Sequence, residues 1–278
     1  MTANPWKASL FLKFARHENR TVLVDRRHSG PLVIQKPLYP EGDSVCHAVM
    51  IHPPGGVAGN DEITVEANLG AFSKAVIANP AATKWYKTGI SIARQETRIK
   101  LEQAATLEWL PCENIFFNAA RAELSFELSL GLNACAIGWE VNVLGRTAHG
   151  ENWYKGAITS RSQIRNHLGT LIWAEQNLIE PCSPTRAAAQ GLYGYNVFGC
   201  LWATSPDCTA TWAEGLAPEL PYANEIKAGI TCVAHNLLVV RILAHRVEPV
   251  RQLLMLVWRR LRQKIIGLAP MPLRLWST

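Results

Sequence analysis

The chain has 278 residues, 48% of them hydrophobic, with a net charge of +6 and a pI of about 9.0. This composition excludes a disordered chain, and the length allows one large domain or two small ones. The positive balance is compatible with an acidic partner such as nucleic acid, although an ordinary excess of Lys and Arg explains it equally well.

The N-terminal region predicts short strands and no targeting segment. Residues 1–14 lack the long apolar run and the small-residue cleavage site of a signal peptide. Strands are predicted at residues 21–24, 32–35 and 45–51, which are mostly aliphatic and are separated by Gly, Pro and Asn. The chain therefore opens as a run of strands.

The glycine-rich sequence HPPGGVAGND, at residues 52–61, raises the question of phosphate binding. A P-loop needs a lysine that this segment lacks, and a dinucleotide-binding loop opens a helix, whereas a strand pattern follows here. Because glycine adopts positive φ without strain, a tight connection between two strands is favoured instead. We assign structural roles in this turn to His52, Pro53, Pro54, Gly55, Gly56 and Gly59.

The clearest strand patterns lie at residues 63–69 and 121–130. Apolar and polar residues alternate along both segments, as a strand with one buried face requires. Further strands are predicted at residues 75–78, 98–102, 106–110, 138–144 and 237–243. Because strands follow strands without intervening helices, the order is not that of βαβ units. The pattern indicates a mainly β fold.

No linker clearly divides the chain, so we expect a single domain over residues 1–278, with a possible loop at residues 176–190. The longest uncharged run, residues 187–206, is long enough to span a membrane as a helix. It contains three glycines and several polar side chains, which suit strands and turns better than a bilayer. We therefore predict no membrane segment.

One amphipathic helix is predicted near the C-terminus, at residues 248–267. Pro249 suits its first turn, and Gly267 suits its C-terminal cap. Its apolar stripe, with a spacing of three and four residues, consists of Val250, Leu253, Leu254, Val257, Trp258, Leu261 and Ile265. The other side is expected to face solvent or a partner and carries Arg251, Arg259, Arg260, Arg262 and Lys264.

The seven cysteines and eight histidines form no recognisable motif. No CxxC, HExxH or HxH sequence occurs, and His47 and His52 would face opposite sides of one strand. An odd number of scattered cysteines indicates reduced, buried thiols in a cytoplasmic protein. The GxSxG sequence of a nucleophile elbow is also missing. We therefore predict neither a stable metal site nor catalytic residues.

Six sequence blocks follow one another along the chain: GPLVIQKPLYPEG at residues 30–42, HPPGGVAGND at 52–61, AATKWYKT at 81–88, LEWLPCENIFF at 107–117, GWEVNVLGR at 138–146 and LRLWST at 273–278. In order and spacing, these blocks resemble the UreD (UreH) family of urease accessory proteins. The departures from the family pattern are Asn60 and Ala81 in place of glycine, Trp85 in place of Phe, and Cys112 in place of Gln. Asn60 tolerates positive φ, so the turn is expected to persist.

The resemblance implies a function that composition does not show. Proteins of this family are not enzymes; they bind apo-urease and, with the helical accessory protein UreF and the GTPase UreG, help to deliver nickel to its active site. The implied fold is mainly β, a β-helical stack of sheets with about two α-helices. A β-rich hydrolase and a basic nucleic-acid-binding protein are the alternatives, the second resting on a single basic and aromatic cluster at residues 84–87.

A nickel ion in transit has to be held weakly. A closed set of His and Cys ligands would retain nickel, so we expect a hydrated path lined by carboxylates and hydroxyls, with no stably bound cofactor. The candidates are Asp61, Thr83 and Glu140, which lie in matched blocks, and Glu175, which is placed by spacing alone. Candidate partner contacts are Lys84, Trp85, Tyr86, Arg259 and Arg260. Core packing is the alternative for Trp85 and Tyr86.

Overall fold

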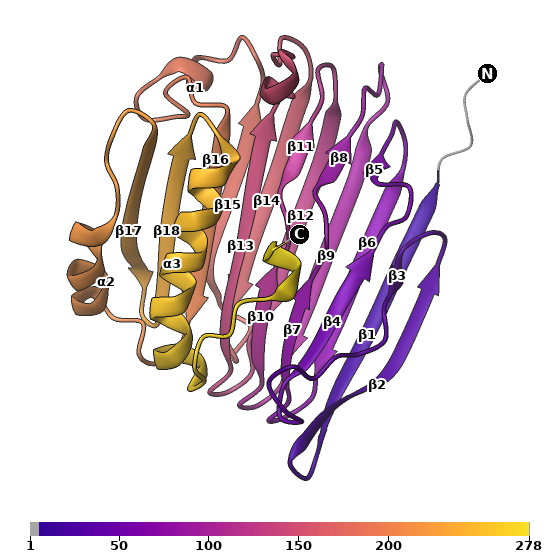
Figure 1. The fold of residues 1–278 in the computed structure, drawn as a ribbon, viewed down its shortest axis with the longest axis vertical. Helices are drawn as coiled ribbons and strands as arrows, with labels where there is room; N and C mark the ends of the chain where they lie inside the picture. The colour runs from indigo at the N-terminus through magenta and orange to yellow at the C-terminus, as the bar shows by residue number, and fades with distance from the viewer. Residues whose placement is uncertain (1–5, 278) are drawn as a thin grey trace.

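Two β-sheets form most of the molecule and lie one behind the other (Figure 1). The structure is a computed structural model that describes residues 6–277. In spatial order, the smaller sheet contains β15 (Leu171–Ile179), β14 (Ala157–Arg165), β12 (Arg121–Ser129), β9 (Ala93–Leu101), β6 (Glu62–Leu69), β1 (Lys7–His17) and β2 (Arg20–Ser29). The larger sheet contains β17 (Ile226–Ala234), β18 (Leu237–Ala244), β16 (Val197–Thr204), β13 (Cys135–Leu144), β10 (Thr106–Leu110), β7 (Lys74–Ala78), β4 (Cys46–Ile51) and β3 (Val33–Ile34).

A third, shorter ladder closes the space between the two sheets. It consists of β5 (Gly56–Val57), β8 (Thr83–Trp85) and β11 (Asn114–Phe116), which pair in parallel, and β11 also pairs with the end of β13. From β4 to β14 the chain passes from the larger sheet through the short ladder to the smaller sheet, and each strand pairs in parallel with its counterpart in the next turn. The strands that pair antiparallel are β2, β3, β15, β16, β17 and β18. The result is a β-solenoid of about four turns, which confirms the predicted β-helical stack of sheets.

The predicted alternation reflects which face of each sheet is buried. Along β6 and β12, every second residue is buried in the solenoid interior, while the others are partly exposed. Both faces of β13 are largely buried, because one faces the interior and the other faces the C-terminal helix. The outer face of the smaller sheet carries cross-strand ion pairs such as Arg94 with Glu123, 2.7 Å apart, which add little stability because they are exposed.

Within the described residues, three α-helices accompany the sheets: α1 (Pro184–Ala187), α2 (Ala210–Leu216) and α3 (Val247–Ile266). Short 3-10 turns occupy Thr147–His149, Ala217–Glu219 and Arg274–Ser277. The amphipathic helix was predicted correctly as α3, which ends at Gly267 with φ of 71°. Its apolar stripe packs on the outer face of the larger sheet, over β13, β16 and β18 (Figure 1).

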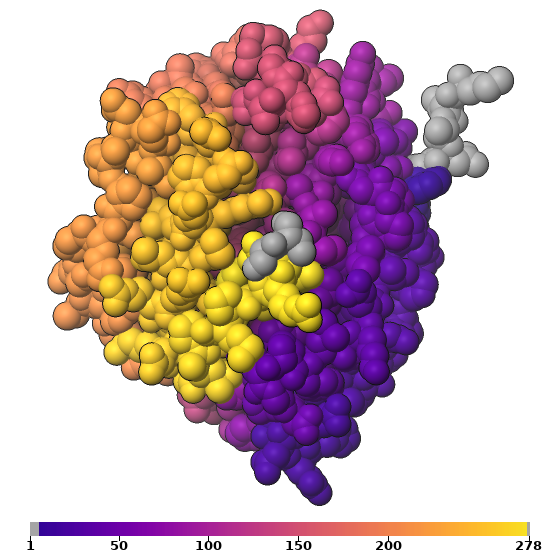
Figure 2. Space-filling view, viewed as in Figure 1, coloured from indigo at the N-terminus to yellow at the C-terminus, as the bar shows by residue number. Residues whose placement is uncertain are grey.

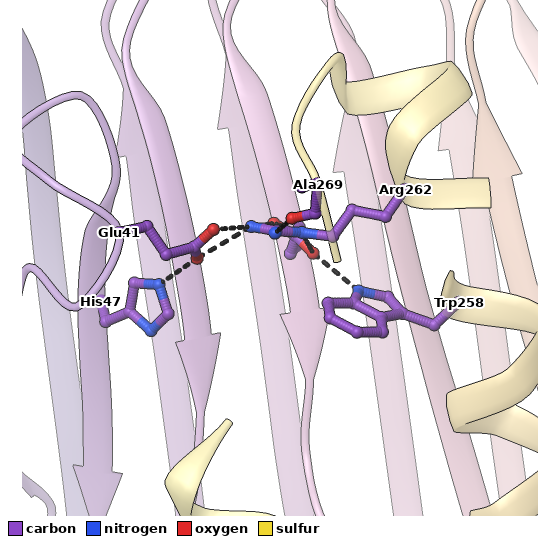
Figure 3. A network of polar contacts seen from close by, with 6 residues as sticks. Glu41, His47, Trp258, Arg262 and Ala269 are labelled. Atoms are coloured by element: carbon purple, nitrogen blue, oxygen red, sulfur yellow. Dashed lines mark hydrogen bonds and ion pairs between the residues drawn. The ribbon is translucent and has the colours of Figure 1, made fainter. Parts of the chain in front are cut away.

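The prediction that Arg262 lies on the solvated side of α3 is wrong, because its side chain is completely buried. Arg262 Nη2 lies 2.6 Å from Glu41 Oε2 and 3.0 Å from Glu108 Oε1, and its Nη1 donates to the carbonyl of Ala269 (Figure 3). Trp258 Nε1 donates to Glu108 Oε2 at 2.7 Å. Ion pairs therefore connect α3 to the solenoid, through Glu41 and Glu108. Figure 2 shows the yellow C-terminal segment lying against the indigo N-terminal part of the molecule.

Other predictions about single segments have mixed outcomes. Of the predicted loop, residues 176–179 belong to β15 and Pro184–Ala187 form α1. The uncharged run at residues 187–206 contains β16, and no helix within residues 6–277 is long and apolar enough to cross a membrane. All seven cysteines are free, but only Cys46 and Cys208 are buried, and Cys182 is exposed, so the expectation that all seven are buried is wrong.

Candidate functional site: two adjoining polar cavities

Two cavities lie inside the solenoid, between the two sheets. The first has a volume of about 320 Å³ and reaches the corner formed by residues 79–83 and by His52. The second has a volume of about 480 Å³ and lies toward β14, β15, β16 and β18. Three residues line both cavities, namely Trp109, Phe126 and Glu140. The cavities therefore adjoin at a point where two aromatic rings, with centroids 6.0 Å apart, lie beside one carboxylate.

The structure brings three of the four predicted conduit residues to these cavities. Thr83 and Glu140 line the first, and Glu140 and Glu175 line the second. Asp61 lies outside both linings. Its carboxylate accepts hydrogen bonds from the backbone N–H groups of Ala58, at 2.8 Å, and Trp6, at 3.1 Å. Asp61 therefore supports the glycine-rich turn instead of facing the cavity.

The glycine-rich segment is a corner of the solenoid, and part of it is strand. Gly56 and Val57 form β5, and a Cβ atom on Gly56 would lie 2.5 Å from the carbonyl oxygen of Lys84 on β8. Gly55 and Asn60 adopt positive φ, at 71° and 65°, so Asn60 does fill the place of a glycine. As expected, β6 follows this segment, and no helix N-terminus is available there for a phosphate.

His52, Pro53 and Gly55 of this segment also line the first cavity. Burial lowers the pKa of His52, and the negative charge of Asp61 opposes that shift only in part. His52 is therefore neutral at neutral pH and adds a polar but uncharged group to the wall. Pro54 and Gly59 complete the turn, and Gly59 passes close to Thr88 and Ser91 of the next solenoid turn.

A chain of buried polar side chains crosses three solenoid turns and ends at Glu140. Trp85 Nε1 donates to Asn114 Oδ1 at 3.0 Å, Asn114 Nδ2 donates to Asn142 Oδ1 at 3.3 Å, and Asn142 Nδ2 donates to Glu140 Oε1 at 2.7 Å. Trp85 is fully buried and stacks on Phe116, with ring centroids 5.6 Å apart. Trp85 therefore belongs to the core, as the core-packing alternative predicts, and not to a partner surface.

Glu140 is the carboxyl group that both cavities share. Its accessible surface faces the cavities, but protein surrounds the group, and burial raises its pKa. The hydrogen bond from Asn142 opposes this effect, and the charge of Glu175 adds to it. Ionisation of Glu140 is therefore disfavoured in the folded state, so this carboxyl group holds its proton more readily than an exposed glutamate does.

We expect Glu140→Gln to be at least as stable as the parent protein at pH 7. A carboxyl group with a raised folded-state pKa favours folding fully below its ordinary pKa of about 4.3, and this contribution is lost as the pH rises through the folded-state value. Glutamine keeps the acceptor for Asn142 without the charge. Urea unfolding at pH 7 and at pH 4 measures the effect, and any advantage of the variant should shrink at the lower pH. A clear destabilisation confined to pH 7 would contradict this account.

The second cavity owes its polarity to residues from five strands. On the antiparallel strands β14 and β15, Ser160 lies opposite Asn177 and Ser162 lies opposite Glu175 in the strand register. On the facing sheet, Glu140, Cys200 and Arg241 lie in register across β13, β16 and β18. Sequence analysis missed Asn177, Cys200 and Arg241, because no local pattern marks them and only the strand register brings them together.

These groups do not form a preformed metal site. Within residues 6–277, no three His, Cys, Asp or Glu side chains are placed to hold a metal ion together. Burial raises the pKa of the Cys200 thiol, as does the nearby charge of Glu175, so the sulfur stays protonated and is a poor ligand. The lining instead offers separated carboxylate, amide and hydroxyl oxygens, which suit weak and transient contact with a cation.

The other candidate partner contacts lie at the surface. Lys84 is exposed on β8, and Tyr86 is half-buried, with its ring packed edge-on against Phe117. Arg259 and Arg260 are both exposed on α3, and Arg260 Nη2 lies 2.8 Å from Glu219 Oε2. The four side chains are accessible, but they form two separate groups, Lys84 and Tyr86 at β8 and Arg259 and Arg260 on α3.

The fold and the cavities define a class of protein, a β-solenoid with two adjoining internal cavities and a C-terminal helix packed on its larger sheet. The sequence model described as "UreD urease accessory protein" matches residues 7–277. The chain is 48% identical to the urease accessory protein UreD of Cupriavidus pinatubonensis, with 98% of this chain and 95% of the relative covered. It is 45% identical to that of Ralstonia nicotianae (98% and 94% covered) and 34% identical to that of Bordetella pertussis (100% and 99% covered). The chain belongs to the UreD family of urease accessory proteins.

Proposed function

We propose that this protein is a non-catalytic scaffold that binds apo-urease and, together with UreF and UreG, assists delivery of nickel to the urease active site. In this proposal Ni²⁺ is the cargo and crosses the protein through the two adjoining cavities, and no cofactor stays bound. The protein acts in the cytoplasm and binds neither nucleic acid nor membrane.

The observation that carries the proposal is the pair of polar cavities inside a chain of the UreD family. Thr83, Glu140 and Glu175 follow one another along the cavities and present a hydroxyl and two carboxylates. Oxygen groups spaced along a hydrated passage bind a divalent ion weakly enough to release it. At the junction of the two cavities, the apolar rings of Trp109 and Phe126 lie beside Glu140, which is the charged side chain that both cavities share.

The two alternatives have less support. A hydrolase needs a nucleophile or a water molecule activated by a base, and the carboxylates of Glu140 and Glu175 are instead engaged with Asn142, Asn177 and Arg241. A nucleic-acid-binding surface with stacking aromatics is disfavoured because Trp85, the centre of the basic and aromatic cluster, is fully buried.

The proposal is tested by producing urease with UreF and UreG in cells that contain or lack this chain. We expect urease purified without the chain to contain only a small fraction of its nickel, measured by atomic emission, and the chain to co-purify with apo-urease. Equal nickel content in the two urease preparations would contradict a role for this chain in nickel delivery. Turnover of generic ester and phosphoester substrates by the purified chain would favour the hydrolase alternative instead.

A further inference from the structure

Arg241 lies at the boundary between the second cavity and the protein surface. It lines the second cavity and also an outer pocket of about 340 Å³ that contains Tyr193, Tyr222 and Lys227. Its side chain is 57% exposed, whereas that of Glu175, its ion-pair partner, is 18% exposed. The pair therefore spans the wall between the interior and solvent.

The contact between the two side chains is one of charge. Arg241 Nη1 lies 2.7 Å from Glu175 Oε2, yet among the described residues this oxygen has no partner in hydrogen-bond geometry. The other oxygen, Oε1, accepts a hydrogen bond from Asn177 Nδ2 at 3.1 Å. Asn177 thus fixes the carboxylate, while Oε2 is balanced by the guanidinium charge alone and keeps its lone pairs for another cation.

Charges on both sides hold Arg241 in this position. From the interior, Glu175 attracts it, and Glu140 lies on the same inner face, in register with Arg241 through Cys200. From the outer pocket, the ammonium group of Lys227 repels it, and this group is held over the rings of Tyr193 and Tyr222 at 4.7 and 4.8 Å. The negative charges that would attract a cation into the cavity therefore also keep the guanidinium of Arg241 there.

We propose that Arg241 is a counter-ion gate: its guanidinium occupies the place of a divalent cation at Glu175 and has to move outward before such a cation can bind there. The inference rests on the proposed function and deepens it by naming the residue that controls cation access. A divalent ion carries twice the charge of a guanidinium and binds the free lone pairs of Oε2 directly, so it displaces Arg241. Because the arginine is more than half exposed, it can leave without disturbing β18.

The test measures Ni²⁺ binding to the purified full-length chain by equilibrium dialysis with Ni²⁺ alone. We expect Arg241→Gln to bind Ni²⁺ about fivefold more tightly than the parent, an effect limited by solvent screening of the pair. Arg241→Lys keeps the charge and should remain close to the parent. The matched control is Arg246→Gln, which should have no effect on Ni²⁺ affinity. Arg246 is an exposed arginine just after β18, and it forms an ion pair with Glu248.

Adding Glu175→Gln to Arg241→Gln should abolish the gain in affinity. The inference is overturned if Arg241→Gln binds no more tightly than the parent, including the case in which neither binds, or if the gain persists without Glu175. Nickel loading of urease separates this outcome from the proposed function. If Arg241→Gln binds Ni²⁺ more tightly but loss of the cavity carboxylates leaves nickel loading unchanged, the gate is supported and the delivery path is excluded. If Arg241→Gln binds no more tightly but loss of the carboxylates slows loading, only the gate is excluded.

Discussion

Arg262→Met is expected to destabilise the protein severely. The change leaves Glu41 and Glu108, which are 8% and 2% exposed, facing each other without their shared cation. Removing one partner of a buried ion pair typically costs about 3–5 kcal/mol, because a buried charge stays uncompensated. That is a large part of the total stability of about 5–15 kcal/mol of a typical domain. Thermal and urea unfolding of the purified variant measure the loss.

Two further variants separate charge from packing at this site. Arg259→Met changes an exposed arginine of the same helix and should alter stability by less than about 0.5 kcal/mol. Adding Glu41→Gln and Glu108→Gln to Arg262→Met removes the stranded charges and should recover part of the loss. An Arg262→Met protein that unfolds like the parent, or one that gains nothing from the two glutamines, would show that the network does not hold α3 in place.

The same network makes the protein sensitive to acid. Burial alone would raise the pKa of Glu41, but hydrogen bonds from His47 Nε2, 2.7 Å away, and from Arg262 outweigh burial, so the pKa is lower than usual. A carboxylate with a lowered folded-state pKa stabilises the fold above its ordinary pKa of about 4.3 and loses this contribution as the pH falls through the folded-state value. The contribution of Glu41 to the attachment of α3 is therefore expected to weaken as the pH falls below the ordinary glutamate pKa of about 4.3, which urea unfolding at a series of pH values measures.

The double variant Glu140→Gln and Glu175→Gln is expected to have the largest effect on nickel delivery. Both carboxylates line the second cavity, and glutamine keeps their size and their acceptors for Asn142 and Asn177. If removing the two charges raises the highest free-energy barrier for the ion in the second cavity by about 1.4 kcal/mol, passage becomes about tenfold slower. We therefore expect about tenfold slower loading of urease, measured as nickel per active site over time.

The control for this experiment lies on the opposite face of the smaller sheet. Glu123 and Glu127 on β12 form exposed ion pairs with Arg94 and Arg165, and changing both to glutamine removes the same charge outside the cavities. This control should load urease normally. Both doubly substituted proteins should also co-purify with urease, UreF and UreG in equal amounts. Normal loading by the Glu140 and Glu175 variant would exclude these two residues from the path.

Much of the solenoid could be predicted because its strands have one apolar and one polar face. The predicted strand at residues 106–110 matches β10, and residues 63–69 match β6 to within one residue. β1 carries an equally clear alternation, in Ala8, Leu10, Leu12 and Phe14, that the prediction overlooked. β15 could not be found in this way, since its inward side includes Glu175 and Asn177 while Leu178 on the other side is 58% exposed. A strand that lines a polar cavity loses the pattern by which strands are predicted.

The sequence alone determined the β-rich class, the amphipathic helix and, through six ordered blocks, the family. It also gave Asp61, Thr83, Glu140 and Glu175 as candidates, although it could not show that the last three line adjoining cavities or that Asp61 supports a turn. Only the tertiary structure decided that Arg262 is buried between two carboxylates and that Arg241 meets Glu175. The physical reason is that alternation is a local property of each strand, whereas the partners of a charged side chain depend on the register of strands that are far apart in the chain.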